Sequence, residues 1–260
     1  MLAAAVLHAV SLASLSAPSD GVKAKLPNVL VLVSDDQRHD TIHALGNEVI
    51  QTPHLDRLAR GGFVFRNAAI MGSMNGAVCL PSRAMLMSGR SLWRVPGDLK
   101  GAPLWPEVMG KVGYATAGTG KWHNGPAAYA RAFRQGGPVF FGGMSDHTRM
   151  PVFDFDPTGQ YPQQKQRIDT RFSSELFADA AVDFLRKHKG PQPFFLCVAF
   201  TAPHDPRTPP GRYARMYDAD KMPMPKNFLP KHPFDNGELK IRDEQLAPWP
   251  RTPDVIRRHL

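Results

Sequence analysis

Cys79, one of two cysteines in this 260-residue chain, is the residue with the clearest chemical setting. It is followed by Leu80, Pro81, Ser82 and Arg83, and then by a run that predicts a helix. Backbone N–H groups at a helix start lack partners within the helix and favour negative charge. The planar guanidinium of Arg83 suits a tetrahedral oxyanion. The segment therefore predicts an anion site, and the alternative is an inert, buried cysteine beside a turn.

Two adjacent carboxylates, Asp35 and Asp36, follow the Val- and Leu-rich run 28–34. Such a run is typical of a strand buried on both faces of a parallel sheet. Neighbouring carboxylates repel one another unless a cation lies between them. Open α/β sheets bind ligands at the carboxyl ends of their strands. The pair therefore suggests a metal site, and the alternative is a charged turn.

Two further polar groups follow predicted strands. Gly120-Lys121-Trp122-His123 comes after the small-residue strand 114–118, and Thr201-Ala202-Pro203-His204 comes after the apolar strand 194–200. Taken alone, a lysine is usually solvated and a single histidine is usually structural. For His204 the alternative to a role in a pocket is a capping histidine at a strand end. Cys197, inside the second strand, is expected to belong to the core.

Taken together, these motifs resemble a known family. Cys79 to Arg83, followed by Ser88-Gly89-Arg90, is similar to the signature of the type I sulfatases of the alkaline-phosphatase superfamily. The Thr-Pro-x-Leu-Asp pattern from Thr52 and the Gly-Lys-Trp-His tetrad also resemble that family. The resemblance implies an α/β alkaline-phosphatase-like fold, in which helices flank a mostly parallel central sheet.

The resemblance also implies site roles. In the family, a separate maturation enzyme oxidises the signature cysteine to formylglycine, and the hydrated aldehyde is the nucleophile. Carried over to this chain, the catalytic residues are Cys79, Arg83, Lys121, His123 and His204. Lys121 and His204 would also bind the substrate. The divalent cation, calcium or alternatively magnesium, would be held by Asp35, Asp36 and the residue derived from Cys79.

The rest of the chain is expected to provide the scaffold. Helices are predicted from residue 52, over 104–112 and over 170–189, and a short strand over 63–65. Residues 124–169, rich in Gly, Pro and aromatics, are expected to form irregular specificity loops. Within them, Asp146, His147 and Asp154 are weaker candidates for sugar or metal contacts, and ordinary turn chemistry is the alternative.

The two ends of the chain differ in character from its centre. Residues 1–17 are apolar and small, which indicates a signal peptide and leader over 1–24 and a periplasmic or secreted protein. No strand is expected from 208 to 253. There Asp235-Asn236-Gly237 resembles the family's second metal pair, but it follows no apolar run and is more typical of a turn. Thr252-Pro253-Asp254 predicts the start of a capped helix, which would have only about two turns before Leu260. We therefore expect residues 25–260 to be the N-terminal part of the catalytic domain, incomplete at its C-terminal end.

The composition limits the classes of ligand that the chain is expected to bind. The chain is 42% hydrophobic with a formal net charge of +9, and its basic residues are scattered. We therefore expect an anionic small molecule or glycan as partner, with no nucleic acid and no membrane span. The first hypothesis is a sulfuric ester hydrolase acting on sulfated carbohydrate or aryl sulfate. The alternatives are a phosphoester or phosphonate hydrolase of the same superfamily, and an inactive truncated fragment.

Overall fold

A four-stranded parallel sheet forms the centre of the computed structural model, which describes residues 26–73, 78–235, 237 and 239–260. The strand order is β1-β6-β2-β3. The strands are β1 (Val29–Val33), β2 (Ala115–Lys121), β3 (Gln135–Phe140) and β6 (Phe194–Ala199). Every pairing in this sheet is parallel, so all four carboxyl ends meet at one edge. The α/β fold predicted from the sequence is confirmed.

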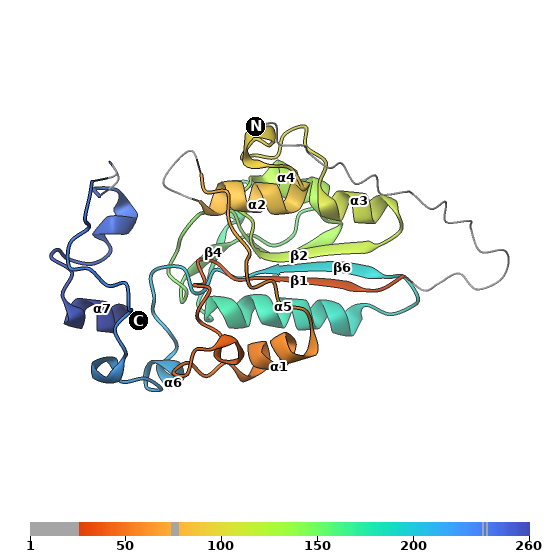
Figure 1. Cartoon of the computed structure of the whole chain (residues 1–260). Coiled ribbons are helices and arrows are strands. Elements are labelled where there is room, and N and C mark those ends of the chain that lie inside the picture. The colour runs from red at the N-terminus through yellow and green to blue at the C-terminus, as the bar shows by residue number, and fades with distance from the viewer. Residues whose placement is uncertain (1–25, 74–77, 236, 238) are drawn as a thin grey trace, which may run out of the picture.

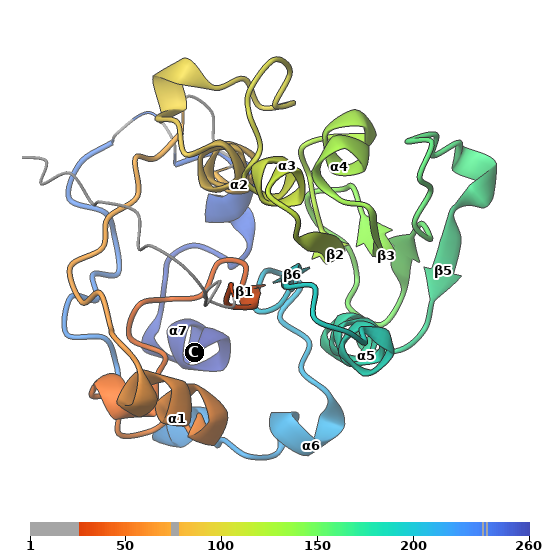
Figure 2. The ribbon, with the colours of Figure 1, turned by 90° about the vertical axis from the view of Figure 1, so that its right-hand side faces the viewer.

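Helices cover both faces of the sheet (Figures 1 and 2). One face carries α2 (Cys79–Ser88), α3 (Trp105–Lys111) and α4 (Pro126–Ala132). The other face carries α5 (Ser173–Lys187), with α1 (Pro53–Gly61) on the same side. The helices expected from residue 52, over 104–112 and over 170–189 are therefore present. On the second face α5 packs against β2, β3 and β6, which leaves β1 partly uncovered.

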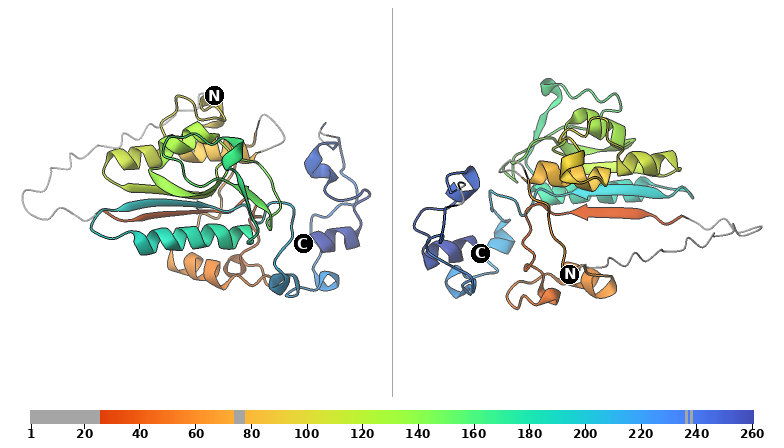
Figure 3. Two further views of the ribbon diagram at one scale, coloured as in Figure 1. Left: turned by 180° about the vertical axis from the view of Figure 1, so that it is seen from behind. Right: turned by 45° about the horizontal axis from the view of Figure 1, so that its top comes forward.

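Smaller elements complete the described chain. A two-stranded antiparallel sheet joins β4 (Met150–Val152) to β5 (Arg167–Asp169). The C-terminal segment, with α6 (Gly211–Ala214) and α7 (Pro253–His259), lies beyond the carboxyl ends of the strands (Figure 3). Short 3₁₀ turns occur at His43–Leu45, Leu92–Arg94, Gln163–Lys165, Ala219–Lys221 and Arg242–Gln245. Among the described residues, no helix is both long and apolar enough to cross a membrane.

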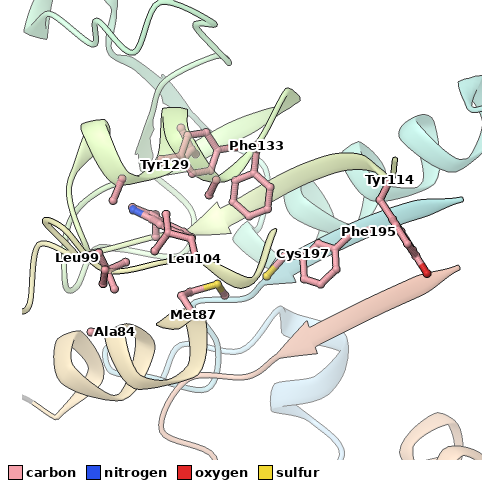
Figure 4. Packing of buried hydrophobic residues seen from close by; sticks show 14 of the residues in the cluster. Ala84, Met87, Leu99, Leu104, Tyr114, Tyr129, Phe133, Phe195 and Cys197 are labelled. Atoms are coloured by element: carbon pink, nitrogen blue, oxygen red, sulfur yellow. The ribbon is translucent and has the colours of Figure 1, made fainter. Parts of the chain in front are cut away.

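The central strand β6 connects two hydrophobic cores. Phe195 and Cys197 pack with α2 and α4 (Figure 4), whereas Leu196 and Val198 pack with α5. This alternation is the period of two that a strand imposes on its side chains. Each large apolar side chain that is fully buried stabilises the fold by about 1.5–3 kcal/mol. The sheet edge that carries the polar motifs is therefore anchored from both faces, and Cys197 is core, as predicted.

Three expectations about the scaffold were wrong. β1 is not buried on both faces: Leu30 and Leu32 are 49% and 52% exposed, because β1 is the edge strand of the described sheet. Residues 63–65 do not form a strand, because no strand of the described part of the chain pairs with them, and Phe63 and Phe65 are 82% and 80% exposed. The segment 124–169 is not mainly irregular, since it contains α4, β3, β4 and β5. Its Gly and Pro residues are tolerated because β3 is also an edge strand.

Candidate functional site

The carboxyl ends of three neighbouring strands carry the polar motifs. Asp35 and Asp36 follow β1, Lys121 ends β2, and His204 lies in the turn after β6. Because β6 lies between β1 and β2, these residues are gathered at one edge although they are far apart in the sequence. The backbone N–H of Asp35 donates to the carbonyl of Ala202 at 3.2 Å, which ties the β1 and β6 turns together.

The signature cysteine stands at the first residue of α2. Its Sγ lies 3.2 Å from Nδ1 of His123. His123 has a φ of +68°, a left-handed conformation that a residue other than glycine adopts at an energetic cost. Asn124 holds the same region by donating from Nδ2 to the carbonyls of Leu80 at 3.0 Å and Gly97 at 2.6 Å. The strained turn after β2 thus places an imidazole against the start of α2.

Two cations share one buried carboxylate. Nζ of Lys121 lies 2.5 Å from Oδ2 of Asp35, and Nη2 of Arg83 lies 3.5 Å from the same oxygen. The side chains of Lys121, Asp35 and Arg83 are 0%, 6% and 8% exposed. Nη1 of Arg83 also donates to the carbonyl of Lys121 at 2.6 Å. Two positive charges therefore face one negative charge in a region from which water is largely excluded.

A second cluster forms beside this pair. Nε2 of His204 lies 3.4 Å from Oδ2 of Asp36, and Nδ1 of His204 lies 3.2 Å from Oδ1 of Asp205. Among the described residues, these three form a group whose ligand atoms lie within 4.8 Å of one another, as a metal ion would require. Asp205 is also paired with Arg242 at 2.7 Å. Asp35 and Cys79 are not members of this group.

The electrostatic environment changes the proton affinity of two groups. Burial lowers the pKa of His123 to about 4, and the positive charges of Lys121 and Arg83 act in the same direction. His123 is therefore neutral near pH 7, and its Nδ1 can accept a proton. Burial raises the pKa of Asp36; His204 opposes this shift, whereas repulsion from Asp35 adds to it.

The weaker candidates from the sequence separate into two kinds. Asp146 caps its own turn through Thr148, and Asp154 pairs with Arg167 at 3.2 Å, so both fit ordinary turn and surface chemistry. His147, in contrast, is 2% exposed and contacts the backbone of His204. In the other candidate turn, the N–H of Gly237 donates to Asp235 at 2.7 Å. Asn236 lies outside the described residues.

Three residues near the site were missed or undervalued by sequence reasoning: Asp205, Asn124 and His147. Asp205 and Asn124 directly follow residues already singled out, so adjacency to a predicted site residue at a strand end was an available signal. His147 carried no such signal. It reaches the site from the loop between β3 and β4, and only the three-dimensional arrangement connects it to His204.

A parallel sheet with helices on both sides, with a cysteine, two carboxylates and converging cations gathered at the strand ends, agrees with the alkaline-phosphatase-like fold that the resemblance implied. Comparison with known proteins identifies the family. The sequence profile of the sulfatases matches residues 27–247, and the chain belongs to the sulfatase family.

Relatives and solved structures agree with this membership. The chain is 26% identical to the N-acetylglucosamine-6-O-sulfatase of Bacteroides thetaiotaomicron, over 92% of this chain and 41% of that protein. It is 28% identical to the human N-acetylgalactosamine-6-sulfatase, over 69% of this chain and 40% of that protein. A solved structure in complex with its substrate D-glucosamine-2-N,6-O-disulfate shares the fold, with a TM-score of 0.65 and 24% identity, covering 77% of this chain and 39% of the other. The chain thus spans less than half the length of these relatives.

Proposed function

We propose that this chain is the N-terminal part of the catalytic domain of a sulfuric ester hydrolase that acts on a sulfated carbohydrate. The contact of 3.2 Å between Cys79 Sγ and His123 Nδ1 carries the proposal, because it sets residue 79 against a proton acceptor beside two cations. Similarity to two amino-sugar sulfatases supports the substrate class. An aryl sulfate is the simplest test substrate.

The chain's own residues would bind the sulfate group and move protons. Arg83 and Lys121 supply positive charge where the ester oxygens gain negative charge. Nε of Arg83 is buried and has no hydrogen-bond partner among the described residues, which leaves it as a donor for an oxyanion. Neutral His123 can take a proton from residue 79 at Nδ1. Oxidised to formylglycine, residue 79 would supply a hydrated aldehyde as the attacking hydroxyl.

The acidic residues fit a hard divalent cation. Both cation contacts of Asp35 use Oδ2, so its Oδ1 can face a metal, and Asp36 lies alongside. Carboxylate oxygens are the ligands preferred by Ca²⁺ and Mg²⁺. The soft thiol of Cys79 does not fit such a cation, whereas an oxygen at residue 79 after oxidation would. When bound, the cation would neutralise charge on the sulfate oxygens.

An open cleft offers room for the remainder of a substrate. Its volume is about 800 Å³, and it lies between the turn after β6 and the C-terminal segment. His204 lines the cleft together with Arg207, Arg257 and Arg258. Guanidinium groups at the wall of a cleft favour an anionic ligand. A sulfated glycan is anionic and large enough to occupy this cleft while its sulfate group lies beside His204.

The deciding experiment measures sulfate release by protein coexpressed with a formylglycine-generating enzyme. Substrates are 4-nitrophenyl sulfate and N-acetylglucosamine 6-sulfate. Turnover that is abolished in Cys79→Ala but retained per folded molecule in the core variant Cys197→Ala supports the proposal. Turnover that survives in Cys79→Ala contradicts the role of residue 79. Faster hydrolysis of the matched phosphate ester would favour the phosphoester alternative, and no turnover of either ester would favour an inactive fragment.

A further inference from the structure

His147 occupies a buried position where three segments of the chain meet. It is 2% exposed and lies in the loop between β3 and β4. Nδ1 lies 2.8 Å from Oγ of Ser173, the first residue of α5, and 3.2 Å from Oγ1 of Thr201, just after β6. Nε2 lies 2.9 Å from the carbonyl oxygen of His204. The imidazole therefore bridges the start of α5 and the turn that carries a site residue.

The partners of His147 determine which ring nitrogen carries the proton. A carbonyl oxygen can only accept, so Nε2 must be the N–H that donates to His204. Nδ1 of the neutral ring then accepts from a hydroxyl. Thr201 Oγ1 donates to Ser173 Oγ at 2.9 Å, which leaves the Ser173 proton for Nδ1 of His147. Each group in this series donates to the next: Thr201 donates to Ser173, Ser173 to His147, and His147 to the carbonyl of His204.

The ring of His147 is held in this orientation. Its centroid lies 5.6 Å from that of Phe172, with the two ring planes at 35°. The backbone carbonyl of His147 accepts from the N–H of Ser173 at 2.7 Å. Both the main chain and the side chain of His147 are thus anchored to the first turn of α5. A buried polar group with satisfied partners on every side specifies one arrangement of the segments it joins.

The anchored turn in turn orients His204. The N–H of His204 donates to the carbonyl of Thr201 at 3.1 Å, while its own carbonyl is held by His147. With both peptide groups fixed, the ring of His204 places Nε2 3.4 Å from Asp36. We propose that His147, as the Nε2–H tautomer, is a positioning residue that aims His204 at Asp36 and the anion pocket. The sulfate readout below rests on the proposed function, but the tautomer readout does not.

The first test uses the unmodified 260-residue chain. Long-range proton–nitrogen NMR correlations of the histidine rings report which nitrogen of His147 is protonated. We expect a proton on Nε2 and none on Nδ1 at neutral pH. A Nδ1–H tautomer in the folded wild-type chain would overturn the proposal, whether or not the protein hydrolyses any ester.

The second test compares variants. His147→Leu removes the donor to His204, whereas His147→Gln can place an amide N–H where Nε2 was. We expect His147→Leu to shift the ring signals of His204 and weaken binding of inorganic sulfate by about five- to tenfold, as for loss of one positioned hydrogen bond. His147→Gln should reverse most of both effects, and His54→Leu, on an exposed histidine of α1, should produce neither. Unchanged His204 signals in a folded His147→Leu protein would refute the proposal. If His147→Leu fails to fold, His204 signals in His147→Gln that differ strongly from wild type would refute it.

If the His204 signals respond as expected but sulfate does not bind to the wild-type chain, the positioning role stands and the proposed function fails. If sulfate binds equally well to wild type and to folded His147→Leu, the proposed function stands and the positioning role fails. The two outcomes are therefore distinguishable with one set of proteins.

Discussion

Nζ of Lys121 and Oδ2 of Asp35 lie 2.5 Å apart and join the ends of β2 and β1 across the end of β6. Both side chains are almost fully buried, at 0% and 6% exposed. An ion pair in such a place is costly to form and costly to break, because each charge needs the other in the absence of water. The pair also keeps the ammonium of Lys121 at the sheet edge where the sulfate would bind.

The first prediction concerns this pair. Lys121→Met should lower the free energy of unfolding by about 3 kcal/mol, because among the described residues it leaves the Asp35 charge with Arg83 alone as ion-pair partner. Lys111→Met is the matched control, since Lys111 is 70% exposed in its pair with Glu107 and should change stability by less than about 1 kcal/mol. Urea denaturation measures both variants. Equal effects of the two substitutions would contradict the buried pair.

The second prediction concerns Gly120, which directly precedes Lys121. Its φ is +97°, and a Cβ there would lie 1.9 Å from the carbonyl oxygen of Ala199. Gly113 has the same φ of +97° but nothing within 4 Å of its Cβ position. Gly113→Ala should therefore cost about 1 kcal/mol for backbone strain alone. Gly120→Ala should cost several times more or prevent folding, because β2 and β6 must separate. Similar thermal midpoints for the two variants would contradict the prediction, because they would show that β2 and β6 can separate at little cost in stability.

The third prediction concerns His123. Its pKa of about 4 lies below the ordinary value of 6.5, so between these pH values the unfolded chain binds more protons than the folded chain. Stability should therefore fall as the pH drops from 6.5 to 4, and this loss should be smaller in His123→Asn. His54→Asn, at an exposed histidine of α1, is the control variant. An NMR titration of the His123 ring checks the cause directly, and a ring that titrates near 6.5 would contradict it.

The fourth prediction concerns Asp169 and tests the fold away from the site. Hydrogen bonds from Arg171 and Arg167 hold the pKa of Asp169 well below its usual range, although burial opposes them. The stability from this group is present above the unfolded-state pKa and is lost as the pH falls below it. Asp169→Asn should therefore cost about 1 kcal/mol at pH 7, and the difference from wild type should shrink from pH 4 to pH 2. Urea denaturation across this pH range measures the stability of each variant, and Asp183→Asn, at an exposed aspartate, is the control. A stability difference between wild type and Asp169→Asn that stays constant from pH 4 to pH 2 would contradict the prediction.

The fifth prediction concerns the proposed cation. A ligand that binds only the folded chain raises its melting temperature, and at a hundred times the dissociation constant it adds about 2.7 kcal/mol. We expect calcium to raise the midpoint of the wild type and also that of the control Asp218→Asn, which changes an exposed aspartate within the C-terminal segment. Asp36→Asn should lose most of the shift. A wild-type melt that does not respond to calcium or magnesium would argue against a cation site at Asp35 and Asp36 in this chain.

Local patterns in the sequence were enough to predict the strands that carry the site and the helix that begins near Cys79, and the family resemblance added the α/β fold class. Their physical basis is short in range: apolar runs mark buried strands, and capping residues and stripes mark helices. The same local patterns failed at Phe63 and Phe65, and over β3. Whether a short apolar or Gly-rich run becomes a strand depends on whether another strand is available to pair with it.

The family resemblance named the site residues, but only the tertiary structure showed which of them meet. Lys121 and Asp35 are 86 positions apart, and their contact depends on β6 lying between β1 and β2. The same strand order brings Asp205 beside Asp36. His147 reaches His204 only because the loop after β3 folds onto the start of α5. The sequence by itself determined which groups could do chemistry, whereas strand order and burial decided their partners, because such contacts join segments that no local pattern relates.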